Sequence, residues 1–191
     1  MRLVRLASPL CLLFLVTACA PPPAQPPAPA TQTVSVERGA YLVNAMGCHD
    51  CHTPWHVTPT GPEPDMSRAL SGHPEGMAMA APPAVDPATG WGMVAAVTNT
   101  AWAGPWGISY TANITSDQNT GLGIWTEDMF MKAIREGKHM GTSRPILPPM
   151  PWPMIRNLND GDLKSIFAYL KTVPPIVNHV PEPVPPAAPA K

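Results

Sequence analysis

The feature that most constrains this chain is the stretch "GCHDCHTPWH" at positions 47–56. Within it, Cys48, Cys51 and His52 place two thiols and an imidazole inside five residues. Side chains at this spacing can hold a metal ion, form a disulfide or attach a cofactor, and each use needs different surroundings. The choice therefore depends on where the chain is sent and on which other ligands it offers.

The first 18 residues have the pattern of a bacterial export signal. Two arginines without any acid precede a short apolar run at 10–16, and small residues follow it. The run is too short to span a bilayer by itself. The stretch "VTAC", which ends at Cys19, resembles a lipobox, so we predict that Cys19 is lipidated. The alternative is ordinary cleavage beside Ala18 and Ala20.

Proline marks both ends of the remaining chain. We interpret residues 19–34 as the lipid-bearing cysteine and a semi-rigid Pro-rich tether, and 177–191 as a Pro-rich C-terminal tail. Residues 35–176 then form one domain, which is long enough for a single core. The formal net charge is −1 and no basic patch is present, which argues against a nucleic-acid-binding protein.

Two of the possible uses of the cysteine motif find no support elsewhere in the sequence. A structural zinc site needs four ligands, usually from two cysteine pairs, and the chain has four cysteines in total. Of these, Cys11 leaves with the export signal and Cys19 is the predicted lipid site. A redox dithiol normally follows a strand in a βαβ pattern, which we do not find.

The pattern C-x-x-C-H is the attachment site of c-type haem. Haem is attached in this way outside the cytoplasm, which agrees with the export signal. We therefore predict that Cys48 and Cys51 bind one haem c covalently and that His52 is the proximal iron ligand. An alternative is an interaction protein in which the two cysteines form a disulfide.

Three segments have the start and stop signals of helices. Each begins at a residue that can cap a helix N-terminus, and each ends at glycine or proline. The segments are 35–47 with Ser35 as cap, 125–137 with Thr126 as cap, and 157–175 with Asn159 as cap.

The order of these segments resembles the class I cytochrome c family, and within it the bacterial monohaem cytochromes that serve periplasmic or membrane dehydrogenases. The matching pieces are "RGAYLVNAMGCHDCHTP", "ANITSDQNTGLGIWTEDMFMKAIREGKHMG" and "RPILPPMPWPMIRNLNDGDLKSIFAYLKTVPP". The resemblance implies an all-α fold around one covalent haem. In that fold the first and last helices cross. The residues that match this crossing are Gly39 with Tyr41 or Leu42 on one side, and Phe167, Tyr169 and Leu170 on the other.

Residues 55–110 depart from this resemblance. They form a long insertion rich in proline, glycine and methionine, which we expect to be mostly irregular. Residues 93–110 within it look like one or two short strands around "AGPWG", because Gly104-Pro105 favours a bend.

The sixth iron ligand is predicted in the stretch "ILPPMPWPM", where Met150 lies between prolines. Prolines fix φ and stiffen a loop, and a stiff loop can hold a thioether against iron. The family resemblance points to the same methionine. A His/Met pair raises the reduction potential because thioether sulfur is soft and suits ferrous iron. The competing ligands are Met154, His139 and Met140.

Two further roles concern the surroundings of the cofactor. Asn113 and Thr115 of "NIT" are candidates to hydrogen-bond a haem propionate, as the resemblance implies, with a plain turn as the alternative. A haem histidine usually donates its other ring N–H to a carbonyl. The candidate acceptors in the proline-rich stretch after His52 are Pro54, Pro59 and Pro62.

The function expected from these features is that of a one-electron carrier and not of an enzyme. It would be lipid-anchored on the periplasmic side of a bacterial membrane, or soluble in the periplasm. Its partners would be periplasmic or membrane redox proteins, with a dehydrogenase as donor and a cytochrome or oxidase as acceptor. The alternative class is a haem enzyme or gas sensor with an open sixth iron position. That class needs a distal acid–base residue, and we find no convincing one.

Overall fold

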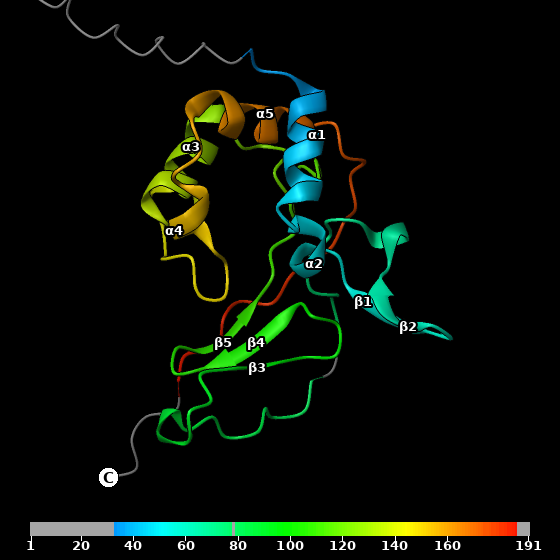
Figure 1. The fold of residues 1–191 in the computed structure, drawn as a ribbon, viewed down its shortest axis with the longest axis vertical. Coiled ribbons are helices and arrows are strands. Elements are labelled where there is room, and N and C mark those ends of the chain that lie inside the picture. The colour runs from blue at the N-terminus through cyan, green and yellow to red at the C-terminus, as the bar shows by residue number, and fades with distance from the viewer. Residues whose placement is uncertain (1–32, 78, 187–191) are drawn as a thin grey trace, which may run out of the picture. The chain divides into compact units, whose positions relative to one another are not determined.

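The computed structural model describes residues 33–77 and 79–186, which belong to one compact unit of the chain. The predicted export signal, Cys19 and most of the predicted tether lie outside the described residues. No helix in the described part is long and apolar enough to cross a membrane. The described part contains five α-helices, which Figure 1 labels: α1 (Val36–Ala45), α2 (Cys48–His52), α3 (Glu127–Glu136), α4 (Trp152–Ile155) and α5 (Asp160–Leu170).

The three predicted helices are present, and their caps are the predicted residues. The side chain of Ser35 accepts a hydrogen bond from the backbone N–H of Arg38 at 3.1 Å, which satisfies a free donor at the start of α1. Thr126 caps α3 and Asn159 caps α5 in the same way. Gly137 ends α3 in the left-handed conformation, with φ at 69°.

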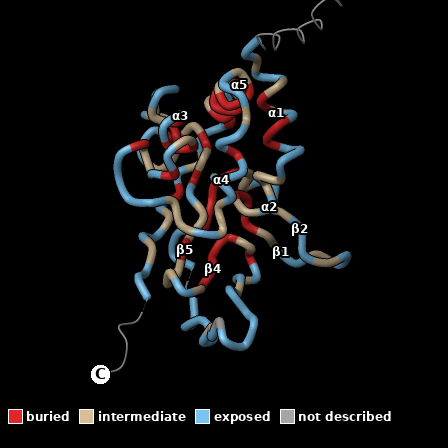
Figure 2. The backbone as a smooth tube through the Cα atoms, turned by 60° about the vertical axis from the view of Figure 1, so that its left-hand side comes forward, coloured by how far each residue is buried: buried red, intermediate tan, exposed pale blue. Residues whose placement is uncertain are grey.

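Helices α1 and α5 pack against each other at a very close approach. A Cβ atom added to Gly39 of α1 would lie 1.9 Å from the carbonyl oxygen of Ser165 in α5, and 2.7 Å from Cβ of Tyr169. Only glycine therefore fits at this position. The crossing predicted at Gly39 is present, and Figure 2 shows buried residues along both helices. The buried core around it consists of Leu42, Val43, Leu70, Leu122, Phe130, Ile134, Ile155, Leu163, Ile166, Phe167, Leu170 and Val173.

The predicted all-α fold class is wrong, because the described residues contain two small antiparallel sheets. The first pairs β1 (Trp55–Thr58) with β2 (Gly61–Pro64). The second has the order β3 (Val94–Ala95), β4 (Ala101–Gly104) and β5 (Gly107–Tyr110). Both sheets belong to the insertion at 55–110, so that segment is less irregular than its composition suggested. The β4–β5 hairpin turns at Pro105-Trp106 and places Gly104 opposite Gly107.

The segment predicted as a tail is bonded to the rest of the domain as far as the structure describes it. We call residues 174–186 the C-terminal strap; it appears in orange and red in Figure 1. Val184 of the strap exchanges two backbone hydrogen bonds with Ile108 of β5, at 2.8 and 2.9 Å. The Asn178 side chain donates to the carbonyls of Ser71 and His73. These hydrogen bonds hold the proline-rich strap in place, although it lies outside the helices and strands of the domain.

Candidate functional site

The motif predicted to attach a cofactor forms the short helix α2. Gly47 precedes it in the left-handed conformation, with φ at 70°, and so turns the chain from α1 into α2. Residues three and four apart lie on the same face of a helix, so Cys48, Cys51 and His52 share one face. Both thiols are free, and Cys48 packs against the buried core. One helix face thus presents two thiols beside an imidazole.

The His52 side chain is buried and oriented by one hydrogen bond. Its Nδ1 lies 2.9 Å from the carbonyl oxygen of Ala112. Because a carbonyl can only accept, Nδ1 carries the ring proton and Nε2 keeps its lone pair. Burial is the main cause that lowers the pKa of His52 to about 4, so the ring is neutral at neutral pH. A neutral imidazole with a free Nε2 is the form that binds a metal.

The predicted acceptors for this ring N–H, Pro54, Pro59 and Pro62, are wrong. The acceptor Ala112 lies 60 residues further along the chain, beyond the end of the insertion. The proline-rich stretch after His52 instead enters the β1–β2 hairpin. No sequence pattern around Ala112 signals the role of its carbonyl, because every residue has the same backbone carbonyl group.

The insertion packs against the Ala112 carbonyl, which accepts the hydrogen bond from His52. The backbone N–H of Gly72 donates to the carbonyl of His52 at 2.8 Å, and His73 N–H donates to Thr111 at 2.9 Å. A Cβ on Gly72, whose φ is +78°, would lie 2.7 Å from the Ala112 carbonyl oxygen. The segment around Gly72 therefore packs directly on the acceptor and needs glycine there. The orientation of a metal-binding histidine depends on such supporting groups.

The surroundings of the thiols count against the other uses of the motif. Burial raises the pKa of Cys48 to about 11 and also raises the pKa of Cys51. A redox dithiol needs a lowered thiol pKa, because the thiolate is the reactive form. In the part of the chain that the structure describes, no group of three or more His, Cys, Asp or Glu side chains could hold a metal ion.

Met150 lies in the loop between α3 and α4. Its side chain is half-buried and packs against the same buried core as Cys48. The competing Met154 is 74% exposed on α4. The His139 ring packs edge-on against Trp125, with ring centroids 5.3 Å apart. These positions favour Met150 over Met154, and the ligand assignment itself stays a prediction.

Asn113 and Thr115 are buried and bonded to other parts of the chain. The two amide N–H groups of Asn113 donate to Thr120 Oγ1 at 3.0 Å and to the Ile176 carbonyl at 2.8 Å. The hydroxyl and backbone N–H of Thr115 both donate to Asn113 Oδ1. These bonds tie the loop to the C-terminal strap and leave no amide N–H of Asn113 for a propionate. A structural role fits them better, and the propionate role stays untested.

Comparison with known proteins gives partial similarity to components of dehydrogenases. No family model matches the chain. It is 28% identical over 150 residues to the fructose dehydrogenase cytochrome subunit of Gluconobacter japonicus, covering 78% of this chain and 24% of that protein. It is 39% identical over 67 residues to the gluconate 2-dehydrogenase cytochrome c subunit of Pantoea cypripedii, covering 35% and 15%. It is 38% identical over 77 residues to one of the subunits of nicotinate dehydrogenase from Pseudomonas putida, covering 40% and 6%.

The chain spans about a quarter or less of the length of these relatives. Two of the three are named as cytochrome subunits of dehydrogenases. The similarity supports an electron-transfer cytochrome of the c type, in agreement with the arrangement of Cys48, Cys51 and His52.

Proposed function

We propose that this protein is a one-electron carrier, a c-type cytochrome in which one covalently bound haem c would be held by Cys48 and Cys51, with His52 and Met150 as the residues that would bind its iron. The observation that carries the proposal is the buried, neutral His52, whose Nδ1–H donates a hydrogen bond to the Ala112 carbonyl. The two free thiols of Cys48 and Cys51 lie on the same face of α2 as this ring. A metal-binding histidine normally donates its other ring N–H to such a carbonyl. The residues present thus fit a covalently attached haem.

Haem c bound at this site supplies reversible exchange of a single electron. The chain's own residues have separate tasks. Cys48 and Cys51 would hold the group through thioether bonds, and the Ala112 carbonyl fixes the His52 tautomer that leaves Nε2 free to bind iron. The soft sulfur of Met150 favours ferrous iron and so raises the reduction potential. No substrate is bound or transformed in this role, which is why we do not propose an enzyme.

We further propose that Cys19 carries a lipid and that the domain stands on the periplasmic side of a bacterial membrane. The support is the export signal, the "VTAC" stretch and the proline-rich residues after it. The donor would be a dehydrogenase, since the relatives carry the names of nicotinate, fructose and gluconate dehydrogenase subunits. The acceptor would be another cytochrome or an oxidase.

Changing Met150 to alanine tests whether its sulfur fills the sixth coordination position of the iron and so closes the iron to other ligands. In the oxidised native protein we expect the weak far-red absorption band of a methionine–iron bond, and little reaction with carbon monoxide after reduction. Met150→Ala should remove the band, open the iron to carbon monoxide and lower the reduction potential, because the sulfur that favours ferrous iron is lost. The measurements are absorption spectra with and without carbon monoxide, and a redox titration.

Met154→Leu is the matched control, because Met154 lies four residues away and is largely exposed. It should keep the far-red band. A Met150→Ala protein with an unchanged band would move the assignment to Met140 or Met154. Native protein that binds carbon monoxide quickly and lacks the band would favour the haem enzyme or gas sensor.

Changing Cys19 to serine tests the membrane anchor. Lipidation requires the thiol, so Cys19→Ser should release a haem-loaded domain into the soluble periplasmic fraction. Several acyl chains hold a protein firmly on a membrane, whereas their removal leaves no comparable anchor. Cys11→Ser is the control, since Cys11 lies within the apolar run of the signal. Identical fractionation of the Cys19→Ser and native proteins would show that no lipid is attached there.

A further inference from the structure

The loop that carries Met150 has few hydrogen-bond donors of its own. Residues 145, 148, 149 and 151 are prolines, and proline has no backbone N–H. Within the described parts of the chain, residues 147–150 have one hydrogen bond, in which Ser109 Oγ donates to the Pro148 carbonyl at 2.5 Å. The loop is therefore held at this point from outside, by the insertion.

The Ser109 hydroxyl is buried on β5 and is oriented by a tryptophan. The indole N–H of Trp106 donates to Ser109 Oγ at 3.2 Å. Because an indole can only donate, the hydroxyl accepts from Trp106 and is left to donate its own proton to a carbonyl. The Pro148 carbonyl is much closer than the alternative acceptor, the Trp102 carbonyl at 3.5 Å. The Trp106 ring in turn lies so close to Gly104 that a Cβ there would be 2.5 Å from the ring.

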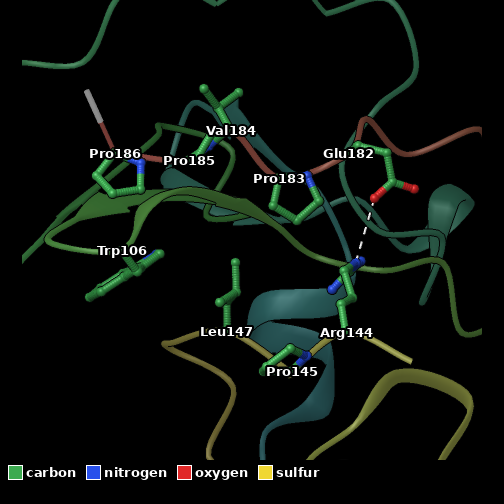
Figure 3. Close-up of a pocket in the computed structure, with 9 residues that line it drawn as sticks. All are labelled: Trp106, Arg144, Pro145, Leu147, Glu182, Pro183, Val184, Pro185 and Pro186. Carbon is green, nitrogen blue, oxygen red and sulfur yellow. Dashed lines mark ion pairs between the residues drawn. The ribbon is translucent and has the colours of Figure 1, made fainter. Parts of the chain in front are cut away.

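The strand that carries Ser109 is fixed on its outer edge by the C-terminal strap. Ile108, the neighbour of Ser109, pairs with Val184 through two backbone hydrogen bonds. Figure 3 shows the groove between the strap and the loop, with Trp106 near one end and the Arg144–Glu182 ion pair at the other. The Arg144 and Glu182 side chains are 3.5 Å apart, and Glu182 is 86% exposed. The buried hydroxyl and the exposed ion pair are thus two separate contacts to the loop.

We infer that Ser109, oriented by Trp106, is a positioning residue for Met150. Its hydrogen bond fixes the Pro148 carbonyl two residues before the methionine, and so limits how far the thioether can move. The inference rests on the proposed role of Met150 as a ligand. Through this hydrogen bond, the β4–β5 hairpin of the insertion influences the reduction potential of the iron and its access to carbon monoxide.

The test compares Ser109→Ala with Ser109→Thr, which keeps the hydroxyl. Losing one buried hydrogen bond should raise the rate at which carbon monoxide enters the reduced iron by about tenfold. The far-red band of Ser109→Ala should also fade at a lower temperature than in the native protein, and the reduction potential should fall. Ser109→Thr should restore all three towards native values. Trp106→Phe keeps an aromatic ring without the N–H and should shift them in the same direction as Ser109→Ala.

Glu182→Gln is the matched control, because it weakens the exposed contact to the same loop. It should leave the carbon monoxide rate and the far-red band unchanged. The inference is overturned if Met150→Ala loses the band while Ser109→Ala and Trp106→Phe both behave as native. If Ser109→Ala does not fold, Trp106→Phe alone decides between these outcomes. A native protein without the band, and with Met150→Ala unchanged, would instead refute the proposed ligand.

Discussion

His52→Ala is expected to abolish the low-spin ferrous spectrum of the protein. The side chain is buried, its Nδ1–H is bonded to Ala112, and its Nε2 is the ring nitrogen left to bind iron. Alanine offers no ligand atom, so the iron loses its proximal bond even if Cys48 and Cys51 still hold the haem. The Ala112 carbonyl also loses its donor, and the lost hydrogen bond is worth about 1 kcal/mol of folding free energy. Absorption spectra of the reduced variant and its thermal unfolding measure the two effects.

His56→Ala is the control for this experiment. His56 is an exposed residue of β1, four positions after His52, and its nearest charged partner is Glu63 at 4.0 Å. It should keep the native spectrum and stability. A His52→Ala protein that retained the native spectrum would show that another histidine is the proximal ligand. His49, His73, His139 and His179 would then need the same test.

Gly39→Ala is expected to destabilise the domain more than any surface substitution. The added Cβ would lie 1.9 Å from the Ser165 carbonyl oxygen and 2.6 Å from its carbon. Backbone atoms cannot move aside as a flexible side chain can, so α1 and α5 would have to separate along their crossing. Overpacking of this kind costs about 3 kcal/mol. For a domain of this size that corresponds to a fall in Tm of roughly 10 °C.

The matched control is Gly92→Ala. A Cβ on Gly92 meets nothing within 4 Å, and its backbone is not in the left-handed region. This variant should unfold within a degree or so of the native protein, since exposed substitutions without special contacts change little. Equal stability of Gly39→Ala and Gly92→Ala would mean that the close helix crossing does not exist in solution.

The helices were predictable because their signals are local. Ser35, Thr126 and Asn159 cap the helices that they were predicted to cap, and Gly137 ends α3. The two sheets were harder to predict, because strands of two to four residues are too short to show periodicity. The hairpin around "AGPWG" was predictable from its turn residues, whereas β1–β2 was missed. Prolines in β2 gave no indication of a strand.

The site was predictable only where its chemistry lies in neighbouring residues. Cys48, Cys51 and His52 are close together in the chain, so their spacing on one helix face follows from the sequence. The partners of such residues come from distant segments and act through backbone groups, as Ala112 does for His52 and Pro148 for Ser109. A backbone carbonyl carries no sequence signature. The one local hint was glycine, since Gly72 packs where a side chain would displace the Ala112 carbonyl.

The most direct test of the central claim is the visible spectrum of the purified native protein, oxidised, reduced, and reduced under carbon monoxide. An electron carrier with His52 and Met150 on the iron should show the far-red band when oxidised. It should show sharp α and β bands when reduced, and these bands should not change on adding carbon monoxide. Absence of haem bands would contradict the attachment at Cys48 and Cys51. Haem bands that shift rapidly under carbon monoxide would contradict the closed iron site and the electron-carrier function with it.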